Sequence, residues 1–192
     1  MTIKCLSICG KSAEELLSLF FISIEKDDDY YHRIALEICR LDNKLLLGIV
    51  NILSENRLRA TIFALSSSGS NDMTLYLSFL KDRRKLVVSS AIDALALVGY
   101  TDWNGISRFL SDNSPFVRGA ALRFAGHVLG SSAYGIISEY QTDTSSIVRQ
   151  NVLDELCDLG DKRAIEIALS MLNDNSKNVR VAAKSLLDHL SN

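Results

Sequence analysis

The chain has 192 residues, of which 47% are hydrophobic and 23% are charged, so it can bury a core and does not have the composition of a disordered protein. A single proline and ten glycines argue against a β-sandwich and against long linkers. The net charge is −2 and neither half of the chain has more basic than acidic residues, so a positive surface for a phosphate backbone is not expected. Nucleic acid is therefore not a favoured partner.

The N-terminal sequence MTIKCLSICG does not have the layout of a secretory signal, because polar residues and a glycine interrupt it. The apolar stretch 16–24 is far shorter than the about 20 residues that span a bilayer. The cysteines form no CxxC pair, and Cys39 and Cys157 lie in apolar stretches, where a free thiol packs as a small hydrophobe. We therefore expect a soluble cytoplasmic protein without membrane contact, disulfides or a metal site.

Helical periodicity divides the chain into six hairpins, each with a first helix, a turn and a second helix. The first hairpin begins near Ser12, where Ser12-Ala-Glu-Glu15 resembles a capping box. The fourth is the clearest, because Ser114 is a good N-cap, Pro115 suits the first helical position and Gly130 ends the helix. No linker interrupts the series, so we predict a single domain, 1–192, with units at 12–42, 45–70, 73–100, 103–130, 133–160 and 162–192.

The dipeptide Val-Arg recurs in the last three hairpins, at 117–118, 148–149 and 179–180, with a spacing of 31 residues. Each arginine follows an aspartate by six residues, and these aspartates are Asp112, Asp143 and Asp174. Weaker copies place Asp82 before Val88 and Asp27 before Arg33. A repeat of about 30–40 residues made of apolar helices is typical of a helical solenoid, whose units bury their faces only against neighbours.

This pattern resembles the HEAT-repeat family, particularly its short bacterial units related to phycobilisome-lyase repeats. The residues that carry the resemblance are Asp112-x5-Arg118-x2-Ala121, Asp143-x5-Arg149 and Asp174-x5-Arg180-x2-Ala183. The resemblance implies an all-α fold, a right-handed α-α superhelix (α-solenoid) of about six HEAT-like helical hairpins. It also implies that the aspartates and arginines tie the turns of adjacent units together and are structural.

Catalytic motifs are missing from the sequence. GxSxG, P-loop and HExxH patterns do not occur, and none of His32, His127 and His189 is followed by glutamate, as the iron-dependent HEAT-repeat hydroxylase motif requires. The basic cluster 81–85 is interpreted as a solvated turn, and Trp103 as a plug between units. We predict that the protein is not an enzyme and carries no cofactor or metal.

The solvent face of each second helix is predicted to lie one, five and eight or nine residues after the position of the repeated arginine. In HEAT-like solenoids the second helices line the concave surface, so this face is the predicted partner-binding groove. The first two units are expected to contribute apolar residues to it, namely Ile34, Ile38, Ala60 and Ala64. The predicted polar partner-binding residues are Ser89, Asp93, Arg123, His127, Gln150, Asp154, Asp158, Ser185 and Asp188.

Two interpretations of this groove stay open. Asp93, Arg123 and Asp154 could pair with one another across neighbouring units, which contributes little when the pairs are exposed. Alternatively, the mostly acidic charge favours a basic protein partner. The leading hypothesis is a non-enzymatic protein–protein interaction module, either an inhibitor or immunity protein that neutralises a toxin or effector, or an adaptor. The alternatives are a bilin lyase or chaperone-like subunit, which the resemblance implies, and a HEAT-like nucleic-acid-binding protein.

Overall fold

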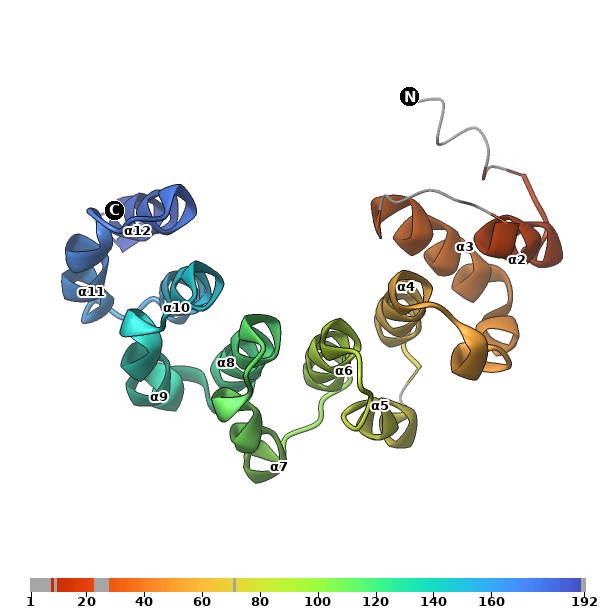
Figure 1. Cartoon of the computed structure of the whole chain (residues 1–192), viewed down its shortest axis with the longest axis horizontal. Coiled ribbons are helices and arrows are strands. Elements are labelled where there is room, and N and C mark those ends of the chain that lie inside the picture. Colours follow the sequence, from red (N-terminus) through yellow and green to blue (C-terminus); the bar gives the residue numbers. More distant parts are fainter. Residues whose placement is uncertain (1–7, 9, 23–27, 71, 191–192) are drawn as a thin grey trace. The chain divides into compact units, whose positions relative to one another are not determined.

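The computed structural model describes residues 8, 10–22, 28–70 and 72–190, and within these ranges it contains helices and no strand (Figure 1). The helices form successive hairpins, so the predicted all-α solenoid is confirmed. Contacts between Cα atoms divide the chain into two compact units, Met1–Gly99 and Tyr100–Asn192. Each unit has its own stack of helices.

In the first unit, α2 packs against α3, and α3, α4 and α6 follow one another in a stack that α5 joins through α6. The described elements are α2 (Ala13–Ile22), α3 (Asp28–Leu47), the 3-10 helix η1 (Val50–Ile52), α4 (Glu55–Ser67), α5 (Met73–Phe79) and α6 (Lys85–Leu97). Helix α3 is interrupted at Asp42, whose φ of −159° and ψ of 99° are extended. The Asp42 carboxylate accepts a hydrogen bond from the backbone N of Lys44 at 3.0 Å, which restarts the helix.

In the second unit, the longer helices α8, α10 and α12 form one layer, and α7, α9 and α11 form the other (Figure 1). Helix α10 contacts both α8 and α12. The elements are α7 (Trp103–Ser107), η2 (Arg108–Ser111), α8 (Pro115–Leu129), η3 (Gly130–Ala133), α9 (Tyr134–Ser138), η4 (Glu139–Thr142), α10 (Ser146–Leu159), α11 (Ala164–Met171) and α12 (Lys177–Leu190).

The helix ends follow local sequence signals. The capping box is confirmed, because the Ser12 N donates to Glu15 Oε2 at 2.8 Å and the Glu15 N donates to Ser12 Oγ at 3.3 Å. Pro115 occupies the first position of α8 as predicted, although the Ser114 side chain makes no capping hydrogen bond. Helix α10 ends at Gly160, whose φ of 65° is left-handed and therefore favours glycine.

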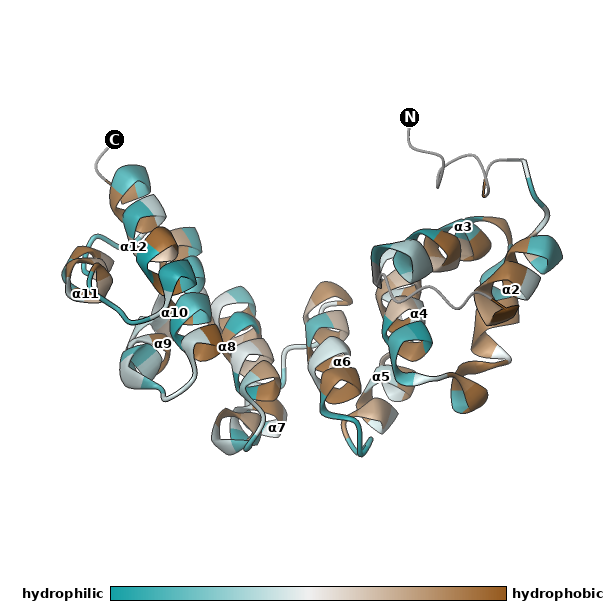
Figure 2. Ribbon diagram, turned by 45° about the horizontal axis from the view of Figure 1, so that its top comes forward, coloured by the Kyte–Doolittle hydropathy of each residue, from teal (hydrophilic) through white to brown (hydrophobic). Residues whose placement is uncertain are grey.

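The core of the second unit lies between its two layers. Val117, Ala121 and Phe124 of α8 are fully buried at helical spacing, while Val128, at the end of the same side, is partly buried. They are followed along the chain by buried residues of α10 and α12. Figure 2 shows hydrophobic and hydrophilic residues alternating along α10 and α12, as expected for helices with one buried side. This packing leaves the polar side of α8, α10 and α12 for solvent.

Candidate partner-binding surface

The repeated arginines lie in the first turns of α8, α10 and α12, and two of them bind the aspartate of the following turn. Arg118 Nε and Nη2 donate to the two carboxylate oxygens of Asp143 at 2.9 and 2.7 Å. Its Nη1 donates to the backbone O of Asp112 and Asn113 at 2.8 and 3.2 Å. One guanidinium therefore joins two successive turns, as the family resemblance implied.

The same bonds recur one repeat later. Arg149 Nε and Nη2 donate to Asp174 at 2.7 and 2.8 Å, and Nη1 donates to the backbone O of Asp143 and Thr144 at 2.8 and 3.2 Å. Both side chains of this pair are only 11% exposed. We call the Arg118–Asp143 and Arg149–Asp174 pairs the turn ladder; its residues are occupied in holding the repeats together.

The turn ladder shifts the pKa of its carboxyls. Burial raises the pKa of Asp143, but the hydrogen bonds from Arg118 and from the backbone N of Ser145 outweigh it, so the pKa lies below its ordinary value. The hydrogen bonds from Arg149 are the main reason that the pKa of Asp174 is lowered. Both aspartates are therefore held in the charged form that the arginines bind.

The first unit joins its turns differently. Val88 stands at the repeat position of the ladder arginines and cannot bind an aspartate. Arg84 binds Asp82 instead, with Nε and Nη2 donating to the carboxylate at 2.9 and 2.7 Å. The Nη1 of Arg84 donates to the backbone O of Leu53 at 3.0 Å, which reaches the preceding turn. Arg33 pairs with Asp29 at 2.9 Å within its own helix, and Asp27 lies outside the described residues.

The solvent side of the second unit carries seven of the predicted binding residues. His127, Asp154, Asp158, Ser185 and Asp188 are exposed, while Arg123 and Gln150 are partly buried. We call this surface of α8, α10 and α12 the second-helix face; it consists of Arg123, His127, Gln150, Asp154, Asp158, Ser185 and Asp188. The remaining two predicted residues belong to α6 in the first unit, where Ser89 is buried at 9% exposure and Asp93 is partly buried.

Arg123 is held in place by Asn151 of the neighbouring helix. Its Nη1 donates to the Asn151 Oδ1 at 3.0 Å. The Asn151 amide lies directly over Gly119, because a Cβ built on that glycine would be only 2.2 Å from Asn151 Nδ2. Glu155, one turn further along α10, lies over Gly126 in the same way, with its carboxylate 2.5 Å from the position of a Cβ. The two helices therefore approach closely along a line of glycines.

This close approach was not predicted from the sequence. Gly119 was assigned to the solvent face, yet it is buried beneath Asn151. The available signal was the spacing of seven residues between Gly119 and Gly126, which places both glycines on one side of α8. Glycines on one helix side leave room for the polar side chains of a neighbouring helix.

The pKa of Asp154 on the second-helix face is raised. Partial loss of solvation is the main cause, and the negative charge of Asp158 raises the pKa further. Gln150 Nε2 donates to Asp154 Oδ2 at 3.4 Å, and this hydrogen bond and the charge of Arg123 only partly offset the increase. Because Asp154 remains exposed, its carboxylate is still accessible to solvent and to a partner.

The prediction that residues of the first two units form an apolar part of the groove is wrong. Ile34, Ile38, Ala60 and Ala64 are all 0% exposed, so they form core and do not line a surface. The reason is that the helices of the first unit are rotated about their axes relative to the prediction. On α4 the exposed residues are Phe63 and Ser67, so Ala60 and Ala64 face the neighbouring helices instead of solvent.

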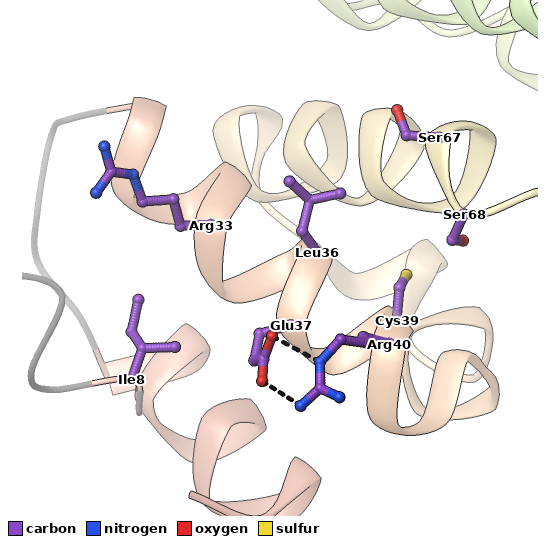
Figure 3. A pocket seen from close by; sticks show the side chains of 8 residues that line it. All are labelled: Ile8, Arg33, Leu36, Glu37, Cys39, Arg40, Ser67 and Ser68. Atoms are coloured by element: carbon purple, nitrogen blue, oxygen red, sulfur yellow. Dashed lines mark hydrogen bonds and ion pairs between the residues drawn. The ribbon is translucent and has the colours of Figure 1, made fainter. Parts of the chain in front are cut away.

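A pocket of about 730 Å³ lies in the first unit, between the α3 residues Arg33 to Arg40 and the end of α4 (Figure 3). Leu36 and the buried Cys39 form its apolar lining, and Ser67 and Ser68 contribute hydroxyls. Arg40 is bound to Glu37, with Nη2 at 2.6 Å from Oε1, so the two charges compensate each other. This pocket was not predicted from the sequence, because Leu36 lies in an apolar stretch and only the structure shows that it is exposed.

No group of three or more histidine, cysteine, aspartate or glutamate side chains in residues 8, 10–22, 28–70 and 72–190 could hold a metal ion. None of the described helices is both long and apolar enough to cross a membrane. Cys39 and Cys157 are free thiols.

Comparison with known proteins supports a HEAT-type repeat. A family model described as a HEAT repeat associated with sister chromatid cohesion matches residues 104–124, which cover α7, the turn and the first part of α8. No curated protein matches the chain in sequence. The match to a HEAT-repeat model is therefore limited to this one segment of the chain.

Solved structures share the fold. An engineered protein is 12% identical with a TM-score of 0.56, and the alignment covers 92% of this chain and 96% of the other. A designed armadillo repeat protein is 13% identical with a TM-score of 0.53, covering 93% and 92%. These are repeat solenoids, a fold that is typical of protein-interaction scaffolds.

Proposed function

We propose that the protein is a non-enzymatic module that binds a partner protein through the second-helix face. The turn ladder supports this choice of surface, because its residues already join the turns of the repeats. They are Arg118, Asp143, Arg149 and Asp174. The charged groups of the second-helix face play no part in these ties. A rigid stack that presents polar side chains from parallel helices is suited to binding a macromolecular surface.

The observation that carries the proposal is the acidic charge of the second-helix face, where Asp154, Asp158 and Asp188 are exposed. The negative charge of Asp158 helps to raise the pKa of Asp154, which shows that the two carboxylates interact. A lysine or arginine of a partner would stabilise these charges on binding. The second-helix face therefore fits a partner with a basic surface.

A basic partner suggests two roles for the module. As an inhibitor or immunity protein it would cover the functional surface of a toxin or effector. As an adaptor it would hold the same partner without blocking it. The inhibitor role is the one we propose, because an acidic face can cover a basic functional surface of the partner.

The test is a tagged pull-down from lysate of the source cells, read by mass spectrometry. Asp154→Lys with Asp158→Lys reverses the charge of the second-helix face, and we expect it to abolish capture of the partner. The matched control is Glu139→Lys with Glu166→Lys, because both of these glutamates are exposed in the other layer. Equal capture by wild type and by the Asp154/Asp158 variant would exclude the proposed surface.

The inhibitor role has its own readout. Once a partner is identified, its activity is measured with increasing amounts of wild type and of each double variant. An inhibitor suppresses the activity at a molar ratio near one, and the Asp154/Asp158 variant does not. If the partner stays fully active in the complex, the inhibitor role is excluded and the adaptor role remains.

A further inference from the structure

Arg180, at the start of α12, has the same backbone anchors as the arginines of the turn ladder. Its Nη1 donates to the backbone O of Asp174 at 2.7 Å and of Asn175 at 3.1 Å. The corresponding distances for Arg118 and for Arg149 are 2.8 and 3.2 Å. The guanidinium of Arg180 is therefore fixed in the orientation that the ladder arginines adopt.

The turn ladder shows what an arginine in this orientation binds. In both Arg118 and Arg149, the Nε and Nη2 edge holds an aspartate carboxylate in a bidentate pair, with distances of 2.7–2.9 Å. For Arg180, none of the carboxylates in residues 8, 10–22, 28–70 and 72–190 forms a hydrogen bond or ion pair with this edge. Arg180 is thus a preoriented carboxylate receptor, and the chain itself supplies two filled copies of it.

The surroundings of Arg180 indicate the kind of ligand. The residue four positions after the ladder arginine is Leu122 in α8 and Leu153 in α10, and both are fully buried. In α12 the same position is Lys184, which is exposed. Lys177 is also exposed and lies three residues before Arg180, so three cations follow the first two turns of one side of α12, before the exposed Asp188 one turn later. This positive surface fits an acidic segment.

We propose that this edge of α12, formed by Lys177, Arg180 and Lys184, binds an acidic segment of a partner protein. Arg180 holds one aspartate or glutamate carboxylate through Nε and Nη2, and the two lysines interact with neighbouring acidic groups. The site shares no residue with the second-helix face, although Ser185 and Asp188 of that face also belong to α12. Its test changes Arg180 alone, so its failure is distinguishable from failure of the proposed function.

The test uses the full chain labelled with ¹⁵N and a synthetic peptide of residues 170–176 with blocked termini, which contains the ladder aspartate Asp174 as its one charged group. The peptide is titrated to about 10 mM at low salt while the Nε–Hε resonance of Arg180 is followed by NMR. We expect a saturable shift of this resonance, because a bidentate carboxylate binds this N–H directly. A peptide with Asp174→Asn should bind about tenfold more weakly.

Two variants make the result specific. Arg180→Lys keeps the charge but removes the fork of donors, and peptide binding followed at the backbone amides of α12 should weaken about tenfold. Arg163→Lys is the matched control, because Arg163 is an exposed arginine of the same unit that binds Asp161, and it should leave binding unchanged. No shift at Arg180 at 10 mM peptide, or equal binding by Arg180→Lys, would overturn the proposal. Concentration-dependent self-association that Arg180→Lys abolishes would also overturn it, since the occupant would then be a second copy.

Discussion

The two compact units connect their successive turns with arginines, but they use different partners. In the second unit, Arg118 and Arg149 reach forward from a helix and bind the aspartate of the next turn. In the first unit, Arg84 and Arg57 reach back to backbone carbonyls of the preceding hairpin, with Arg84 bound to Leu53 and Arg57 bound to Phe20 and Phe21. Arg57 also lies over the ring of Tyr31, at 5.0 Å from its centroid.

This difference between the units separates what every stacked repeat needs from what only the repeated aspartate–arginine pattern adds. Unsatisfied carbonyls at the ends of helices need donors, and a guanidinium has enough donors to serve two turns at once. In the second unit, the aspartate of the next turn adds a charge-assisted bidentate pair with the arginine. In the first unit, the pair is local, between Asp82 and Arg84 of the same turn. The ladder pairs are the more buried of the two kinds, so the second unit should depend on its arginines more strongly.

The largest effect is expected from Arg149→Ala, which leaves the 11%-exposed Asp174 without its partner. We expect the free energy of unfolding of the second unit to fall by about 3 kcal/mol. Arg180→Ala is the matched control, because it removes the same backbone anchors without uncovering a paired carboxylate, and it should cost about 1 kcal/mol. Urea unfolding combined with hydrogen exchange of the second unit measures the free energy of unfolding of both variants. Equal decreases would contradict the prediction that the Arg149–Asp174 pair stabilises this unit.

A smaller loss is expected in acid. The pKa values of Asp143 and Asp174 are lowered in the folded protein. Their stabilisation is therefore complete above the ordinary carboxyl pKa of about 3.9 and disappears as the pH falls through the lower folded values. Below about pH 4 we expect the second unit to lose on the order of 1–2 kcal/mol, measured by urea unfolding at each pH. In Arg118→Ala with Arg149→Ala this part of the pH dependence should be absent; a profile identical to wild type would refute the assignment.

The contact between α8 and α10 should respond to Gly119→Ala. The new Cβ would displace Asn151 and break its hydrogen bond with Arg123, and we expect a net loss of about 1 kcal/mol in thermal or urea unfolding. Gly135→Ala is the control, because nothing lies within 4 Å of a Cβ there, and it should stabilise α9 by about 0.5 kcal/mol. Stabilisation by both substitutions would mean that Asn151 moves aside without cost.

The smallest effect is expected in the first unit, from Thr61→Val. Thr61 is fully buried, and its hydroxyl has no hydrogen-bond partner among the described residues. An apolar side chain of the same shape should raise the free energy of unfolding by up to about 1 kcal/mol. Ser66→Ala provides the contrast, since the Ser66 hydroxyl donates to the backbone O of Phe63 at 3.0 Å, and its removal should not stabilise. Destabilisation by Thr61→Val in urea unfolding would show that the hydroxyl is satisfied.

Much of the fold could be predicted because its signals are local and repeated. The spacing of Asp112, Arg118 and their copies identified a solenoid, and the ladder bonds follow the pairing that the resemblance implied. The candidate surface was less predictable, because it was assigned by counting from the arginine. That count holds for Arg123 and Asp154 on the second-helix face, but it fails for Ser89, Ile38 and Ala64, which are buried.

The helices, the capping box at Ser12 and the aspartate–arginine pattern can be recognised in the sequence, because they depend on residues that are near one another in the chain or recur at a fixed interval. The rotation of each helix about its axis, and therefore the set of side chains that meet solvent, is set by packing between helices. That rotation depends on the neighbouring helices: Asn151 fits over Gly119, and α4 turns Ala60 and Ala64 into the core. The orientation of Arg180 was likewise decided by backbone carbonyls of the preceding turn, whose positions exist only once the hairpin has folded.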